Sequence, residues 1–242
     1  SDFTTVVQNY TTTMGYLHEG GKPVVCIFGL GLNQNPQPTP AAALELINWL
    51  KSRAYVIGSG PFWWRLGKRD ALPNYGAVHA AFDAIMPWSV GRYNSAVSFQ
   101  SLYSQATVGD AAECASRGQG YAPIAFPGYS FYHSAPTTRA FNEIPRNGGA
   151  FMRSQIDAYL HTPGASFFYI AMFDEINEGT AIYKAAARKA DCPSNEAFVY
   201  MGIDGEATAG DFYLKLAGEF ARSAHKGNRS LLNGNRSLLN AH

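Results

Sequence analysis

Segments typical of buried strands alternate with segments typical of helices along most of this chain. Apolar, strand-like runs occupy residues 24–29, 54–58, 84–90, 122–126, 167–173 and 198–203. Strands that alternate with helices form parallel sheets, because each helix returns the chain to the same end of the sheet. The pattern therefore predicts an α/β fold with a parallel sheet, either open or closed into a barrel. About six strands are too few for a complete eight-stranded barrel.

The first helical pattern has the best-defined start. Thr39 is a good N-cap residue, and Pro40 suits the first helical position. Apolar residues at 43, 44, 47 and 50 then repeat at helical spacing, which predicts a helix to about Ser52. Further helices are expected at residues 99–117, 149–161, 181–190 and 210–224. The chain from 1 to 226 is expected to form one α/β domain.

The segment 167–180 carries the clearest chemical signal. Its seven apolar residues predict a strand buried on both faces, and Asp174, Glu175 and Glu178 follow directly. Crowded carboxylates raise each other's pKa, which places a proton donor beside an ionised partner. Glycoside hydrolysis uses such a pair, one carboxyl protonating the leaving oxygen while the other assists attack. The alternative is a solvated acidic loop, or acids at the start of the next helix.

Other candidate side chains follow predicted strands or lie near their ends, and ligands of parallel α/β folds bind at the carboxyl ends of strands. Sugars are bound by ring faces and hydrogen bonds. Substrate contacts are therefore expected from Trp64, Arg65, Trp88, Tyr129, His133 and Asn177. The competing interpretations are core positions for the tryptophans, a salt bridge for Arg65 and simple solvation of His133. Arg146 is expected to fix its loop to the start of the next helix.

Charge and motif content exclude several classes of partner. A formal net charge of +1 gives no electrostatic footprint for nucleic acid. No apolar run of about 20 residues is present, so no membrane span is expected. The six histidines are scattered without His-x-x-x-His or Cys-x-x-Cys spacing, so no metal is expected. Dinucleotide and phosphate-loop motifs are missing too, and no cofactor is expected.

The chain contains three cysteines, three Asn-x-Ser/Thr sequons and one short repeat. Cys26 lies in an apolar run and is expected in the core, whereas Cys114 and Cys192 lie in polar segments and could pair. Asn-x-Ser/Thr sequons at residues 9, 228 and 235 favour a secreted glycoprotein. Residues 227–233 are repeated immediately as 234–240, and 227–242 are expected to form a peripheral tail.

The segment from Met172 to Lys184 resembles the signature of glycoside hydrolase family 71 and family 99-like proteins. Further agreement with these families lies at residues 21–31, 44–49, 126–130, 144–149 and 213–218. Many members are described as xylosidases or arabinosidases, and the characterised relatives are endo-α-mannosidases and α-1,3-glucanases. The resemblance covers the chain from about residue 21 to residue 222.

This resemblance implies a (β/α)8 TIM-type barrel whose first strands are missing from this chain. It implies that Glu175 is the base that helps the sugar's own 2-hydroxyl attack the anomeric carbon. Glu178 would be the general acid for the departing oxygen, and configuration would be retained. Exposed edges of a parallel sheet promote aggregation, so a second chain or copy completing the barrel is one expectation.

The expected function is hydrolysis of an α-linked glycan, mannan- or glucan-like, by the pair Glu175 and Glu178. The expected ligand is an oligosaccharide or polysaccharide. A carbohydrate-binding protein that has lost activity on a degenerate barrel is the first alternative. A structural protein whose repeated tail docks on a neighbouring copy is the second.

Overall fold

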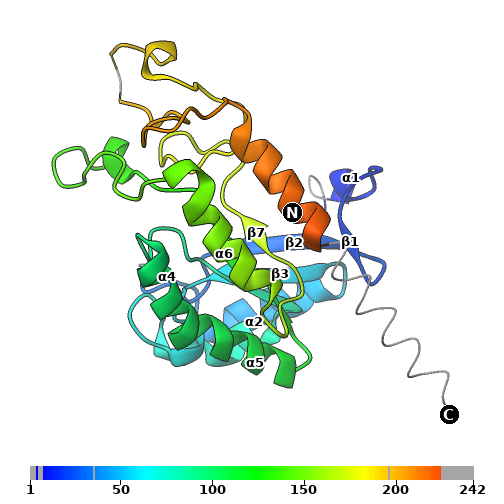
Figure 1. The fold of residues 1–242 in the computed structure, drawn as a ribbon. Coiled ribbons are helices and arrows are strands. Elements are labelled where there is room, and N and C mark those ends of the chain that lie inside the picture. Colours follow the sequence, from blue (N-terminus) through cyan, green and yellow to red (C-terminus); the bar gives the residue numbers. More distant parts are fainter. Residues whose placement is uncertain (1–3, 5–7, 35, 196, 225–242) are drawn as a thin grey trace. The chain divides into compact units, whose positions relative to one another are not determined.

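The computed structural model describes residues 4, 8–34, 36–195 and 197–224 (Figure 1). The chain divides into two compact units. The first holds the chain up to Trp88 together with Gly109–Pro123, and the second holds Ser89–Val108 and the chain from Ile124 onwards. The repeated tail and the sequons at 228 and 235 lie outside the described residues. The sequon residue Asn9 is exposed in α1 (Gln8–Thr11).

The first unit is built on a five-stranded sheet with the order β1-β2-β3-β4-β5. Its strands are β1 (His18–Glu19), β2 (Lys22–Phe28), β3 (Tyr55–Gly60), β4 (Ala84–Pro87) and β5 (Gly120–Tyr121). Strands β2 to β5 pair in parallel, and only β1 pairs antiparallel to its neighbour. The predicted parallel sheet is therefore confirmed for this unit.

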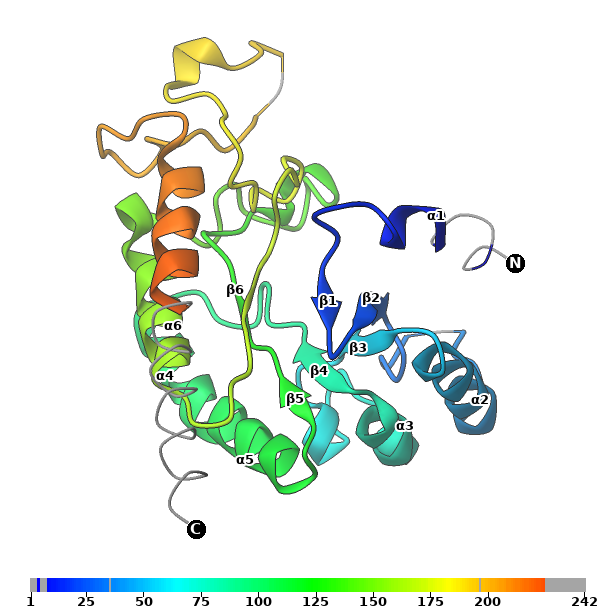
Figure 2. The same ribbon diagram turned by 90° about the vertical axis from the view of Figure 1, so that its right-hand side faces the viewer.

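Helices α2 (Pro40–Lys51) and α3 (Gly76–Ala81) lie on one side of strands β2–β4 (Figure 2). The Thr39 hydroxyl accepts a hydrogen bond from Ala42 N at 3.2 Å, which confirms the predicted N-cap. The core between helices and sheet contains Ala43, Ile47, Leu50, Ala54, Val56, Tyr75, Val78 and Phe82. Helix α5 (Val108–Ser116) supplies buried Ala111 and Cys114 to this unit.

The expected core position of Cys26 is wrong, because this residue is exposed on β2. Successive side chains of a strand point to opposite faces, and it is Val25 and Ile27 that pack against the helical core. Cys26 and Phe28 therefore face the other side of the sheet. Cys114 is buried and Cys192 is partly exposed, and all three thiols are free.

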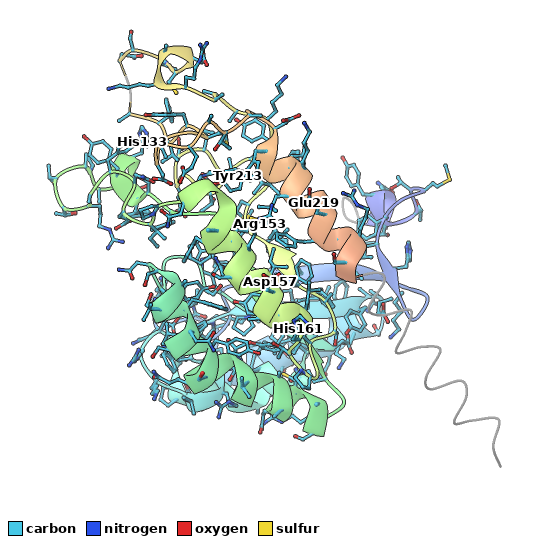
Figure 3. All side chains as sticks on the ribbon, viewed as in Figure 1. His133, Arg153, Asp157, His161, Tyr213 and Glu219 are labelled. Atoms are coloured by element: carbon cyan, nitrogen blue, oxygen red, sulfur yellow. The ribbon has the colours of Figure 1, made fainter. Side chains whose placement is uncertain are left out.

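The second unit contains two parallel strands, β6 (Ile124–Ala125) and β7 (Tyr169–Ile170). Its helices are α4 (Ala96–Leu102), α6 (Ala150–Leu160) and a helix described over residues 212–224. Both views show the last of these running beside α6 (Figures 1 and 2). Arg153 of α6 and Glu219 of the final helix, labelled in Figure 3, form an ion pair at 3.8 Å.

Gln155 of α6 fixes the chain that follows β6. Its side chain is completely buried, and Oε1 accepts hydrogen bonds from Phe126 N and the Tyr93 hydroxyl, both at 3.0 Å. Nε2 donates to the carbonyls of Phe126 at 2.9 Å and Phe151 at 3.0 Å. All four bonds of this amide are thus satisfied within the second unit, which locks α6 to the end of β6.

Three expected features of the second unit are wrong. The run 167–173 forms only the two-residue strand β7, with Phe167–Ile170 partly exposed and Phe173 58% exposed. The described residues of segments 181–190 and 198–203 form neither the expected α-helix nor the expected strand. Instead, Met201 N donates to Ala186 O at 2.9 Å and Gly202 N to Ala187 O at 3.1 Å. These pairings take backbone carbonyls that a helix would use internally.

The part of the chain that the structure describes is a mixed α/β fold with parallel strands. Within it, no helix has both the length and the apolar character required to cross a membrane.

Candidate active site

The acidic segment that follows β7 is a closed backbone turn. Met172 N donates to Thr180 O at 3.2 Å, and Ile182 N donates to Met172 O at 3.1 Å. Inside the turn, the Glu175 carbonyl accepts from Thr180 N at 3.1 Å and from Ala181 N at 3.0 Å. The backbone therefore leaves strand geometry between Glu175 and the end of the turn.

Gly179 closes this turn in the left-handed region, with φ 63°. A Cβ at this position would lie 2.9 Å from a Val199 methyl group and 3.3 Å from the Ser130 Cβ. Both the conformation and the close approach require glycine. The backbone of the preceding residue, Glu178, lies next to the chain at Ser130, whose N–H donates to the Glu178 carbonyl.

Glu175 and Glu178 are both half-buried side chains of this turn. Partial burial and the charge of Glu175 raise the pKa of the Glu178 carboxyl. Neither carboxylate forms an ion pair or a side-chain hydrogen bond with another described residue. Asp174 and Asn177 of the same turn are exposed.

Tyr129 lies beside the acidic turn. Ser130 N donates to the Glu178 carbonyl at 2.8 Å, which joins the two segments. Burial, then the charges of Glu178 and Glu143, raise the pKa of the Tyr129 phenol to about 12. The Tyr129 ring stacks on Phe131 with an interplanar angle of 12°. The structure therefore brings Tyr129 together with Glu178, two of the predicted site residues.

His133 is engaged in packing. Its Nε2 lies 2.6 Å from the Ala197 carbonyl, and its ring stacks on Phe198 with centroids 4.7 Å apart. Figure 3 shows this histidine on the loop that precedes α6. These contacts hold the loop 131–134 against the segment around residue 198. None of them connects His133 to the acidic turn.

Two predicted site residues of the first unit, Trp64 and Arg65, are engaged in packing and in a salt bridge. Trp64 is 3% exposed and packs edge-on against His79, so its ring faces offer no surface for stacking. Arg65 donates to Asp110 at 2.7 Å, which is the salt bridge weighed as the alternative for this residue. Both positions belong to the packed part of the unit, because the 3-10 turn Trp64–Leu66 follows the buried chain after β3.

Trp88 differs from these two because it is only partly buried. It contacts Phe28 edge-to-face, with ring centroids 5.3 Å apart, and Phe28 is 59% exposed. Phe28 ends β2 and Trp88 follows β4, so both lie at the carboxyl ends of parallel strands. Phe28 is not among the site residues predicted from the sequence. Its position directly before Gly29, at a strand end, was the available signal.

Among the residues described, no group of three or more histidine, cysteine or acidic side chains could hold a metal ion. The acidic turn offers two half-buried carboxylates, and the pKa of one of them, Glu178, is raised.

Comparison with known proteins gives a structural likeness only. No family model matches the chain, and no curated protein matches it. A family GH99 endo-alpha-mannosidase from Bacteroides thetaiotaomicron, in complex with bis-tris-propane, matches with a TM-score of 0.69 at 19% identity, over 95% of this chain. A second structure of the GH99 endo-alpha-mannosidase from that organism matches with a TM-score of 0.67 at 18% identity, over 93% of this chain.

A glycoside hydrolase-like protein matches with a TM-score of 0.60 at 21% identity, over 90% of this chain. The matches cover 65%, 61% and 59% of the three other chains, so this chain spans less than two thirds of each. At these identities the likeness establishes a shared fold. That fold is one used by glycoside hydrolases.

Proposed function

We propose that this chain is a glycoside hydrolase that cleaves an α-linked glycan with the carboxylate pair Glu175 and Glu178. One observation carries the proposal: the glutamates share one turn after β7, where partial burial and then the charge of Glu175 raise the pKa of Glu178. An acid with a raised pKa keeps its proton nearer to neutral pH, which suits a proton donor. The fold shared with glycoside hydrolases supports the assignment.

Cleavage would begin with Glu175 removing the proton of the sugar 2-hydroxyl. The 2-oxygen then bonds to the anomeric carbon while the bond to the leaving oxygen breaks. Glu178 donates its proton to that oxygen. Water next opens the three-membered ring: Glu178 accepts a proton from the water, and the 2-oxygen recovers its proton from Glu175. Two inversions give overall retention of configuration.

The proposal is tested by incubating the chain with α-linked mannan and glucan oligosaccharides and analysing the products. Because the family resemblance also includes xylosidases and arabinosidases, α-xylosides and arabinosides belong in the same panel. Glu178→Gln and Glu175→Gln should each reduce turnover at least about 100-fold, since each removes one proton-transfer step. Glu45→Gln, at an exposed position of α2, is the matched control and should retain activity. Turnover that survives both site substitutions contradicts the proposal.

A carbohydrate-binding protein without turnover is the second candidate, and the aromatic pair Phe28 and Trp88 favours it. Aromatic rings that reach the surface at strand ends, as Phe28 does and as Trp88 does in part, bind sugar faces without any need for catalysis. The chain also spans only part of the enzymes that it resembles in fold. Two results together would favour this candidate over the enzyme. The chain would hydrolyse none of the glycans in the panel, and it would bind a glycan that Trp88→Ala no longer binds.

A further inference from the structure

Arg146 is a buried cation of the second unit with an unusual set of partners. Its side chain is 1% exposed, and no carboxylate of the described chain lies within salt-bridge distance of it. Nη2 instead donates to two backbone carbonyls, those of Gly179 and Ala181, at 2.8 Å each. Both carbonyls belong to the acidic turn.

The other neighbours of this guanidinium are an aromatic ring and a thioether, and the charge of Asp204 also acts on it. The ring of Tyr213 faces its central carbon at 4.6 Å, and Nη1 lies 3.6 Å from the Met201 sulfur. Burial lowers the pKa of Arg146 to about 10, which still leaves the side chain protonated at neutral pH. Burying a charge without a salt bridge is costly, so the fold is less stable for retaining this cation. The two carbonyls are its strongest partners.

These carbonyls stand on both sides of Thr180. Gly179 follows Glu178 directly, and the N–H groups of Thr180 and Ala181 hold the Glu175 carbonyl. A clamp on residues 179 and 181 therefore restrains both ends of the Glu175–Glu178 segment. No other side chain of the described residues makes two hydrogen bonds to the backbone of this turn.

We propose that Arg146 is a positioning residue: through the carbonyls of Gly179 and Ala181 it fixes the separation of Glu175 and Glu178. This inference rests on the proposed function of the two glutamates. Arg146 is sealed away from solvent and would not touch a substrate. Its effect on chemistry would come from geometry, because misplacing a reacting group by about 1 Å can reduce a rate roughly 100-fold.

The test replaces Arg146 and measures the ionisation of Glu178 directly. Arg146→Met removes both hydrogen bonds, and Arg146→Lys retains the charge but loses the forked geometry. In protein labelled with carboxyl-¹³C glutamate, the Glu178 resonance is assigned by its loss in Glu178→Gln and then titrated by NMR. We expect the pKa of Glu178 to move towards its ordinary value in Arg146→Met and part of the way in Arg146→Lys.

Gln155→Leu is the control, since it weakens the second unit without contacting the acidic turn. If Arg146 has a purely structural role, the pKa of Glu178 in folded Arg146→Met and Arg146→Lys will equal the wild-type value, as in Gln155→Leu. This result would overturn the inference. If Arg146→Met does not fold, Arg146→Lys decides alone. On a hydrolysed substrate, we expect kcat to fall about 100-fold in Arg146→Met with KM nearly unchanged.

The titration needs no substrate, so the two proposals can fail separately. Absence of turnover in the unmodified chain would remove the proposed function, while the NMR result would still show whether Arg146 sets the geometry of the pair. Turnover with an unshifted Glu178 titration in the Arg146 variants would remove only the positioning role.

Discussion

Arg65 Nε donates to Asp110 Oδ1 at 2.7 Å, joining residues that are 45 positions apart in the sequence. Asp110 is 2% exposed, and its second carboxylate oxygen has no hydrogen-bond partner among the residues that the structure describes. Burial raises the pKa of Asp110 to about 7, although the neighbouring guanidinium opposes this change. The pair therefore makes the stability of the first unit depend on pH.

The first prediction concerns the direction of this dependence. The folded pKa of Asp110 lies above the ordinary value of 3.8, so the folded chain holds a proton that the unfolded chain has released. This contribution is complete below about pH 4 and is lost as the pH rises to about 7. The free energy of unfolding of the wild type, relative to Asp110→Asn, should fall by about 4 kcal/mol over that interval.

Urea unfolding at several pH values between 4 and 7.5 measures this difference. Asp157→Asn is the control, because Asp157 is exposed on α6 and its replacement should leave the pH dependence unchanged. A constant difference between wild type and Asp110→Asn across the interval would show that Asp110 is not perturbed as described.

The second prediction compares two glycines of the first unit. A Cβ at Gly58 of β3 would collide with the ring of Phe82, whereas a Cβ at Gly76 would meet no atom within 4 Å. Gly76 also has helical angles, φ −54° and ψ −42°, at the start of α3. Gly58→Ala should reduce the free energy of unfolding by about 1–3 kcal/mol. Gly76→Ala should increase it by about 0.5–1 kcal/mol.

Chemical denaturation of the two variants beside the wild type provides the measurement. Because both changes add one methyl group, the opposite signs arise from the local surroundings alone. Equal effects of the same sign would contradict the packing of Phe82 against β3.

The third prediction concerns Gln155. Gln155→Leu preserves volume but removes four hydrogen bonds and leaves the Phe126 N–H and carbonyl buried without their partner. Unsatisfied buried groups cost about 1–3 kcal/mol each, so we expect a loss of roughly 2–4 kcal/mol. Gln100→Leu, at an exposed position of α4, should change stability by less than about 0.5 kcal/mol. A similar, small effect for both substitutions would contradict the buried network.

Local sequence signals predicted much of the first unit. Thr39 and Pro40 marked the start of α2, and the alternating apolar runs predicted the parallel strands β2, β3 and β4, because these features depend on neighbouring residues. Cys26 was assigned to the wrong environment for a related reason. Periodicity shows that a strand has two faces, but the face that the helices cover depends on the tertiary arrangement.

The segment after the acidic turn was harder to predict, because long-range pairing overrides local propensity there. The alanine-rich run at 181–190 favours a helix, but Ala186 and Ala187 accept backbone hydrogen bonds from Met201 and Gly202. Likewise, Asn177 and Gly179 are residue types common in turns, but nothing in the local sequence indicates the clamp that holds this turn. Arg146 lies 33 residues before Gly179, and no local pattern indicates that the two meet.

The fourth prediction tests whether the Glu178 side chain faces Tyr129. Burial is the main cause that raises the Tyr129 pKa to about 12, and the negative charge of Glu178 is the next largest. Glu178→Gln removes this charge with little change in size, so the phenol should ionise more readily. We expect the Tyr129 pKa to fall by roughly half to one pH unit, measured by NMR of ¹³Cζ-labelled tyrosine with the signal assigned from Tyr129→Phe. Glu45→Gln should leave it unchanged. If Glu178→Gln also leaves it unchanged, the carboxylate points away from Tyr129, and the proposed site loses the aromatic residue beside its acid.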